Sequence, residues 1–360
     1  MKAVYWGTYD TGKPRNRILL RGLRESGVAV EEIHREIWYG VEDKSQIAGL
    51  FNKVGLLLRW LFCYPGLVLR YLKAPPHDVV VVGYLGHLDV LVIWPFARLR
   101  GCLIVWDAFL SLHDTVVHDR RMIGRYNPFS ILLYLWEALA CRAAGLVLLD
   151  TKAHACFFAE HYRLHESRVC SVFVGAEPEA FPHLEPDLHQ EAERSGVQVL
   201  FYGQFIPLHG IRVIIEAARM LERQPVHWRI IGQGQESSKI RELLEARPLT
   251  KLSWESWVEY GELVGHIKRA DICLGIFGDS DKAARVIPNK VFQVVSAGKP
   301  LITRDSPAIR ELFGPPPADV ILIPPASPEA LAEAVMELAK RLADLPSSEY
   351  LDAAGRVSPE

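Results

Sequence analysis

The chain has 360 residues, of which 49% are hydrophobic and 23% charged, and its formal net charge is −2 at pH 7. This much apolar material can fill the cores of two domains, and the near-neutral charge argues against nucleic acid as the main partner. The six cysteines form no Cys-x-x-Cys pair, which favours buried free thiols over disulfides or a zinc site.

The first half of the chain alternates strand-like runs with helix-length apolar patterns, which predicts a parallel sheet wound with helices. It begins with a strand and has no signal-peptide pattern, so we expect a cytoplasmic protein. The predicted strands are 3–6, 28–33, 78–82, 103–106, 146–149 and 170–174. The predicted helices are 15–26, 47–72, 88–99, 130–144 and 152–161.

The stretch 51–73 is very apolar, contains no acidic residue and carries four cations. Arg59 and the pair Pro65-Gly66 interrupt the apolar run, so a membrane-spanning helix fits poorly. Two interpretations remain open. The stretch is either an interfacial element that contacts anionic lipid, or a helix buried against the first sheet with snorkelling arginines.

The second half begins after an acidic, proline-containing segment without periodicity, which indicates a linker at 181–196. We therefore expect an N-terminal domain at 1–180, a second domain at 197–345 and a tail at 346–360. Strands are predicted at 197–202, 227–231, 272–276, 301–303 and 320–323, with helices in the intervals and a last helix at 328–342. In such sheets ligands bind beyond the carboxyl ends of the strands, so we expect the site in the cleft between the domains.

The segment 284–300 contains the strongest functional signal. A polar loop with Arg285 and Lys290 leads into a short amphipathic helix at about 290–297, which Gly298 closes before the strand 301–303. Free amides at a helix start beside two cations form a suitable site for a diphosphate. An ordinary strand–loop–helix connection would give the same local pattern.

The order of motifs around this segment resembles family 4 glycosyltransferases. A strand ends at Gly203-Gln204, His209-Gly210 opens a helix, a further strand ends at Gly232-Gln233-Gly234, and the segment 288–300 follows. The resemblance covers about residues 197–340, and Val174–Phe181 looks like the interdomain turn of that family. It implies an α/β protein of the GT-B fold, with two Rossmann-like domains facing each other across a cleft.

The resemblance also implies an activity. Such enzymes transfer a hexosyl group from a nucleotide-diphosphate sugar to an acceptor, with retention of configuration and without metal or other cofactor. Helix N-termini and an arginine–lysine pair hold the diphosphate in the family. This chain has Gln204 and His209 at those two positions, so Arg285 and Lys290 are our chemical candidates for the missing cations.

The family also has two glutamates eight residues apart, one near the donor sugar and one on the ribose. Arg285 and Gln293 occupy those positions here. Gln293 can still bond ribose hydroxyls, whereas Arg285 cannot replace a carboxylate, so either the donor sugar differs, for instance by an acidic group, or activity has been lost. The donor-binding candidates are Gly12, Arg15, Gly203, Gln204, His209, Gly232, Gly234, Arg285, Asn289, Lys290 and Gln293.

The acceptor side is predicted from the first half. Polar residues concentrate after the strand 103–106, and Asp107, His113 and Asp114 are the candidates for orienting or deprotonating an acceptor hydroxyl. His87 is the next candidate, and structural roles for all four are open alternatives. The sequence thus predicts a glycosyltransferase of glycan or glycolipid assembly, cytoplasmic and in possible peripheral contact with an anionic membrane through 51–73. Two alternatives are a non-catalytic nucleotide-sugar-binding subunit and a nucleotide-sugar epimerase.

Overall fold

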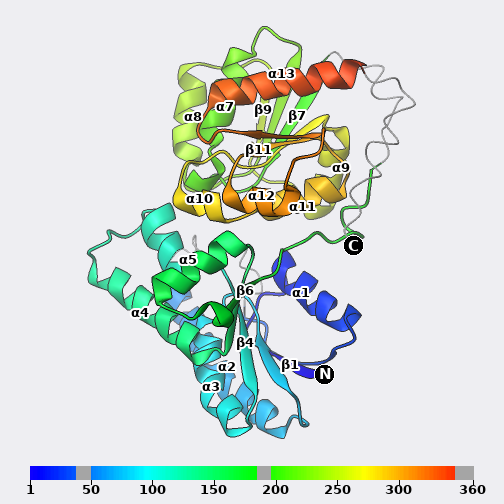
Figure 1. The fold of residues 1–360 in the computed structure, drawn as a ribbon. Coiled ribbons are helices and arrows are strands. Elements are labelled where there is room, and N and C mark those ends of the chain that lie inside the picture. Colours follow the sequence, from blue (N-terminus) through cyan, green and yellow to red (C-terminus); the bar gives the residue numbers. More distant parts are fainter. Residues whose placement is uncertain (38–49, 185–195, 345–360) are drawn as a thin grey trace. The chain divides into compact units, whose positions relative to one another are not determined.

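The computed structural model describes residues 1–37, 50–184 and 196–344, without the side chains of 50–54, 56, 57 and 344. The chain divides into two compact units, Met1–Val174 and Gly175–Glu360, each with its own sheet (Figure 1). The predicted tail at 346–360, most of the predicted linker and the start of the predicted helix 47–72 lie outside the described residues. Phe181, the first residue of the predicted linker, belongs to the second unit, where its carbonyl accepts a 2.7 Å hydrogen bond from Ser296.

Six parallel strands form the sheet of the first unit. They are β1 (Lys2–Gly7), β2 (Ala29–His34), β3 (Val79–Val82), β4 (Leu103–Phe109), β5 (Leu146–Leu149) and β6 (Val169–Ser171). Their order is β2-β1-β3-β4-β5-β6, so the winding reverses between β1 and β3. Strands such as β3 consist of four valines because they are buried on both faces.

Helices cover both faces of this sheet. They are α1 (Pro14–Glu25), α2 (Leu50–Lys73), α3 (His87–Leu99), α4 (Pro128–Ala143) and α5 (Lys152–Tyr162), with short turns η1 (Asp114–Asp119) and η2 (Glu166–Arg168). Right-handed crossovers place α1 on one face and α2 to α5 on the other, because the winding reverses at β1 (Figure 1). Along β1, Tyr5 packs on the α1 side and Trp6 in the larger core under α2 to α5, as the strand period of two requires.

The second unit repeats this design. Its parallel strands are β7 (Val197–Tyr202), β8 (Val226–Ile231), β9 (Leu252–Glu255), β10 (Ile272–Leu274), β11 (Leu301–Arg304) and β12 (Val320–Ile323), in the order β12-β11-β10-β7-β8-β9. The connecting elements are η3 (Pro207–His209), α7 (Ile211–Met220), α8 (Ser237–Ala246), α9 (Tyr260–Arg269), α10 (Asp281–Arg285), α11 (Asn289–Ser296), α12 (Pro307–Phe313) and α13 (Pro328–Asp344).

The structure differs from the sequence-based elements at two places that matter for function. The edge strand β9 was missed, because its apolar–polar alternation Leu-Ser-Trp-Glu extends over only four residues. The segment before Pro288 was expected as a loop, but Arg285 ends the short helix α10, whose Ser280 side chain accepts a hydrogen bond from the Ala283 amide. Over the ranges with assigned structure, no helix combines the length and the apolarity needed to cross a bilayer.

Candidate functional site

The switch point of the second sheet lies between β7 and β10. The chain leaves β7 toward β8 and leaves β10 toward β11, so the two connections diverge and leave room at the carboxyl ends of the two strands. Gly203 follows β7 and Gly275 follows β10. The start of α11 approaches the same point, because the Lys290 Nζ lies 3.5 Å from the Gly275 carbonyl.

Two predicted glycines at this point are required by the backbone. Gly203 has φ +140° and Gly232 has φ +146°, which side chains rarely adopt. A Cβ on Gly232 would lie 1.8 Å from the Gly203 carbonyl oxygen, and one on Gly234 would lie 2.7 Å from the Phe205 carbonyl oxygen. The glycines after β8 therefore let its loop pack tightly against the loop after β7.

Lys290 is the buried charge of this region. Its side chain is 5% exposed, and Nζ lies 3.7 Å from the centroid of the Phe201 ring. A Cβ on Gly203 would lie 2.9 Å from Nζ. Burial lowers the pKa of Lys290 well below its usual value, and within the described part of the chain no carboxylate lies close enough to offset this. An anion beside Nζ would therefore favour the charged form of this amine.

Four other predicted donor residues lie in the segments around Lys290. The His209 side chain is buried, and its Nδ1 contacts the Gln204 carbonyl. The Gln293 side chain is also buried, and its Oε1 accepts a 3.1 Å hydrogen bond from the Tyr202 hydroxyl, which also reaches the Lys290 carbonyl at 3.3 Å. Gln204 is exposed at the end of β7, and Asn289 is half-buried at the first position of α11.

Arg304 is a second buried cation in this unit, and the sequence did not single it out. It ends β11, is 6% exposed and donates to the carbonyls of Gly278 and Ser280, the latter at 3.3 Å. Burial lowers the pKa of Arg304 below its usual value. The Arg304 side chain thereby connects the loop after β10 to β11. The predicted cation Arg285 is half-buried at the end of α10.

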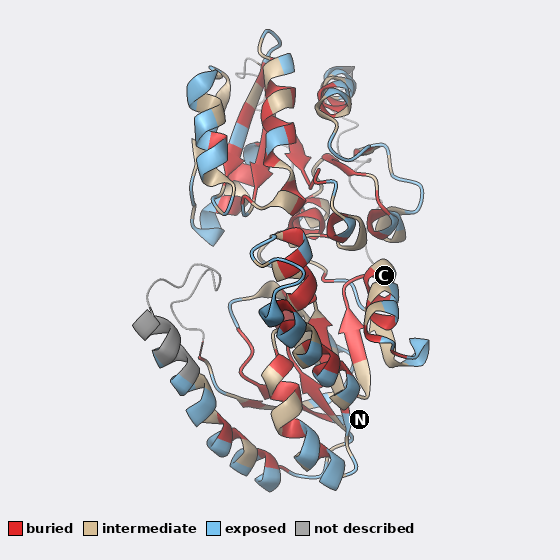
Figure 2. Cartoon of the chain, turned by 90° about the vertical axis from the view of Figure 1, so that its left-hand side faces the viewer, coloured by how far each residue is buried: buried red, intermediate tan, exposed pale blue. Residues whose placement is uncertain are grey.

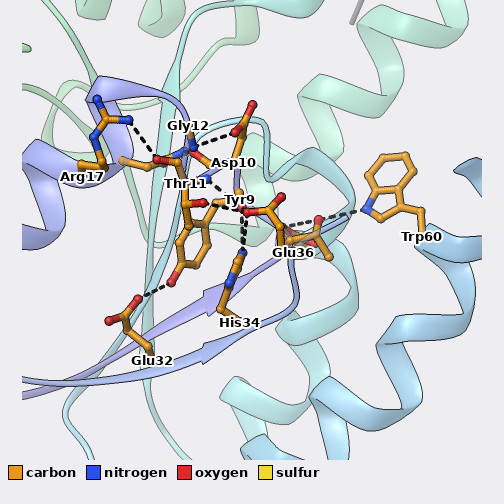
Figure 3. Close-up of polar contacts among 12 residues, drawn as sticks. Tyr9, Asp10, Thr11, Gly12, Arg17, Glu32, His34, Glu36 and Trp60 are labelled. Atoms are coloured by element: carbon orange, nitrogen blue, oxygen red, sulfur yellow. Dashed lines mark hydrogen bonds and ion pairs between the residues drawn. The ribbon is translucent and has the colours of Figure 1, made fainter. Parts of the chain in front are cut away.

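The first unit holds the loop after β1 in place through many polar contacts, several of which are drawn in Figure 3. The Tyr9 carbonyl lies 2.8 Å from His34 Nε2, and Thr11 donates to Glu36 at 2.8 Å. The Gly12 amide donates to Asp10 at 2.9 Å, so this candidate for diphosphate contact already has an internal acceptor. The loop is therefore ordered by the unit itself.

Asp89 anchors the start of this loop. It is 1% exposed and accepts hydrogen bonds from the Thr8 amide at 2.8 Å and the Tyr64 hydroxyl at 2.6 Å. Gly7 has φ +131°, and a Cβ there would lie 2.4 Å from Asp89. Burial raises the pKa of Asp89 above its usual value, although the surrounding donors oppose the shift. The sequence reasoning missed this residue, which lies in the first turn of the apolar helix α3.

Arg15 and Asp107 were predicted as separate site residues, and the structure joins them. They form an ion pair with 2% and 0% of their side chains exposed, through bonds of 2.9 Å from Arg15 Nε and 2.8 Å from Nη2. Arg15 Nη1 also donates to the Val172 carbonyl at 2.6 Å. The pair links α1, β4 and the end of β6. Asp107 could act as a base, and Arg15 could bind phosphate, only after this ion pair opened.

Glu137 is the centre of the polar network around the other two candidates. It is 1% exposed and accepts hydrogen bonds from Ser111 at 2.8 Å, Tyr162 at 2.6 Å and the His113 amide at 3.1 Å. His87 Nε2 lies 3.0 Å from the same carboxylate. Burial alone would raise the pKa of Glu137, but the bonds from His87, Tyr162 and the amide outweigh it and lower the pKa to about 2.

His113 and Asp114 follow this network at the start of η1. Both are buried, and the His113 Nε2 lies 3.2 Å from the Ser130 hydroxyl. Burial and the neighbouring His161 and His118 lower the pKa of His113 below its usual value. The structure thus brings His87, His113 and Asp114 together around Glu137. The sequence reasoning missed Glu137, because a single acid in an apolar helix is its only local sign.

The second unit also matches a known family. Residues 196–341 match the family model described as glycosyl transferases group 1, and this range contains all the candidate donor residues from 203 onward. No curated protein sequence matches the chain.

Solved structures of glycosyltransferases are similar over nearly the whole chain. HepE of Anabaena, in complex with UDP and glucose, has 13% identity and a TM-score of 0.62, covering 98% of this chain and 92% of its own. Sucrose-phosphate synthase from Thermosynechococcus elongatus has 14% identity and a TM-score of 0.66, covering 99% and 92%. The lipopolysaccharide outer core galactosyltransferase WaaB has 13% identity and a TM-score of 0.62, covering 99% and 95%.

At these identities the similarity shows the fold, and the predicted GT-B fold with its two Rossmann-like units is confirmed. The predicted enzyme class is confirmed by the domain match. A group 1 glycosyl transferase domain on a GT-B scaffold makes this chain a glycosyltransferase.

Proposed function

We propose that the chain transfers a hexosyl group from a nucleoside-diphosphate sugar to an acceptor hydroxyl and binds the diphosphate at the carboxyl ends of β7 and β10. The observation that carries this proposal is the buried Lys290 amine. It contacts the Phe201 ring and the Gly275 carbonyl but no carboxylate of the described chain. A diphosphate beside Nζ would supply the missing negative charge. The anion site is then a lysine and backbone amides, and the reaction is proposed to be independent of metal.

The choice of uridine diphosphate as the first donor to test comes from the similar structures. HepE of Anabaena was solved with UDP and glucose and with UDP-glucose. Gln293 is the proposed ribose contact, and its position one helical turn beyond Lys290 on α11 supports this proposal. Retention of configuration is part of the proposal and rests on the family resemblance.

The acceptor is proposed to be carbohydrate or lipid-linked, in glycan or glycolipid assembly at the cytoplasmic face of a membrane. The apolar, acid-free sequence of α2 supports this location. Asp107 on β4 remains a proposed acceptor-side residue, as do His113 and Asp114, which follow β4 in the segment that Glu137 holds in place.

A thermal-shift and calorimetry screen with uridine, guanosine, thymidine and adenosine diphosphates and their sugars tests the donor. A ligand at about 100 times its dissociation constant should stabilise the protein by roughly 2.7 kcal/mol. Product analysis then separates the functions. Transfer needs an acceptor, an epimerase converts the donor alone, and a binding subunit leaves it unchanged. Failure of every nucleotide to bind would refute the proposal.

A further inference from the structure

The outer surface of α2, α3 and α4 is unusual for a protein surface. The three helices lie on the same side of the first sheet, with α3 packed against both α2 and α4 (Figure 1). Their inner residues fill the core, among them Leu67, Ile93 and Leu133. We use the name three-helix face for their outer residues together with the connecting loop 120–127.

Large apolar side chains gather on the three-helix face. On α4 they recur at the spacing of one helix side, and the loop adds Tyr126 at 90% exposure. Figure 2 shows the corresponding exposed residues along the outer side of α2. The exposed apolar residues are Leu58, Leu61, Phe62, Leu69 and Leu72 on α2, Trp94 and Leu99 on α3, Phe129, Ile131, Leu132, Leu135 and Leu139 on α4, and Met122 and Tyr126 in the loop.

The charges of this face have one sign. The only acids on the three helices, Asp89 and Glu137, are each 1% exposed and accept internal hydrogen bonds. The two acids at either end of η1 are buried as well. The exposed cations of the face are Arg59, Arg70, Lys73, Arg98, Arg121, Arg125 and Arg142. A whole chain of net charge −2 thus carries a face with cations and no exposed acid.

We propose that the three-helix face binds the surface of a phospholipid bilayer with anionic headgroups. Apolar side chains interleaved with arginines are suited to the headgroup boundary, where the chains enter the acyl region and the guanidinium groups meet phosphates. A second copy of the same face would bring cations against cations, so self-association is disfavoured. The helices lie on the bilayer and do not cross it.

This inference extends the contact expected from 51–73, because the structure adds the leucines of α4 and the loop 120–127 to it. It does not depend on the proposed reaction, because bilayer binding can be measured without donor or acceptor. If the protein does not bind vesicles, the proposed donor site is not refuted. If it does not bind nucleotides, the proposed bilayer contact is not refuted.

Vesicle co-sedimentation of the full chain tests the proposal. Unilamellar vesicles of phosphatidylcholine alone are compared with vesicles containing phosphatidylglycerol, at low and high salt. We expect binding to the anionic vesicles only, weakened by salt. The variant Arg121→Glu with Arg125→Glu should lower the partition coefficient about twentyfold, and Leu132→Glu with Leu135→Glu at least about tenfold.

Matched variants on the second unit serve as controls. Arg223→Glu and Met220→Glu change an exposed cation and a 52% exposed apolar residue there, and they should leave the partition unchanged. All changed side chains are exposed, so thermal melts should be unaltered. Equal recovery of the protein in the supernatant with and without anionic vesicles would overturn the proposal. The proposal would also be overturned if light scattering showed a dimer that the variant Leu132→Glu with Leu135→Glu dissociates.

Discussion

The two units use the same sheet design, but the buried charges of the first unit and the buried Lys290 of the second have different surroundings. In the first unit the buried charges are satisfied internally: Asp107 pairs with Arg15, and Glu137 and Asp89 accept several hydrogen bonds each. In the second unit Lys290 is buried against a ring and a carbonyl, without a carboxylate near it in the described chain. A satisfied charge holds loops in place, whereas an unsatisfied one is available to a ligand.

This contrast assigns different consequences to mutations in the two units. Removing a partner in the first unit leaves buried groups without their bonds and should cost stability. Removing the lysine in the second unit relieves an unfavourable burial and should cost only ligand binding.

The largest expected effect is that of Glu137→Ala. The change leaves the buried donors of Ser111, Tyr162 and the His113 amide without an acceptor, and should lower the free energy of unfolding of the first unit by about 3–5 kcal/mol. The corresponding fall in Tm is about 10 °C. Denaturation with urea, followed by tryptophan fluorescence, measures it.

The control is Glu160→Ala, which removes an exposed acid from α5 in the same unit and should change Tm by no more than about 1 °C. Acid titration gives a second check. Because the folded pKa of Glu137 is about 2, below that of the unfolded chain, its contribution is full above the unfolded pKa, about 4.3, and is lost as pH falls toward 2. A Glu137→Ala variant as stable as the parent at pH 7 would refute the contrast.

Breaking the Arg15–Asp107 pair should have the next largest effect. Asp107→Ala leaves a buried guanidinium without its carboxylate and should cost about 3 kcal/mol, whereas Arg15→Met combined with Asp107→Leu should recover much of the loss. A double-mutant cycle on urea midpoints measures this. If Asp107 also acts as the acceptor base, Asp107→Asn should lower kcat with KM unchanged, and that result would support its proposed catalytic role.

Lys290→Met should separate binding from stability. We expect the affinity for the nucleoside diphosphate to fall more than about tenfold, and Tm to rise by about 2–4 °C for each kcal/mol of relieved burial. Lys239→Met, which removes an exposed cation of the same unit, should change neither. Calorimetry and thermal melts on the same samples measure the two effects. Unchanged nucleotide affinity would show that Lys290 is not part of the donor site.

The smallest expected effect is the gain or loss of a proton at Lys290 on unfolding and on nucleotide binding. Between the low folded pKa of Lys290 and the unfolded value of about 10.4, the unfolded chain holds more protons, so stability should rise with pH, and Lys290→Met should flatten this slope. An anion beside Nζ raises the folded pKa, so nucleotide binding should take up a proton. Calorimetry in buffers of different ionisation enthalpy detects that uptake, and its absence would show that the protonation of Lys290 does not change when the nucleotide binds.

Most of the fold could be predicted because its signals are local. Apolar runs such as Val79–Val82 and Leu146–Leu149 and the glycines that follow strands placed nearly every element. β9 was not predicted, because an edge strand needs apolar side chains on only one face and its sequence signal is therefore weaker. The donor candidates from 203 onward gather near the strand ends of the second unit, because the carboxyl ends of parallel strands meet at one edge.

The amino-acid order by itself determined the alternation of strands and helices, the glycines at the strand ends and the position of Lys290 at the start of a helix. Only the tertiary structure decided which charges meet. Arg15 and Asp107 are 92 residues apart, and Glu137 meets His87 across 50 residues, so no local pattern could distinguish structural side chains from available ones. Pairing over such distances depends on the order of strands in the sheet, and that order arises only when the whole unit packs.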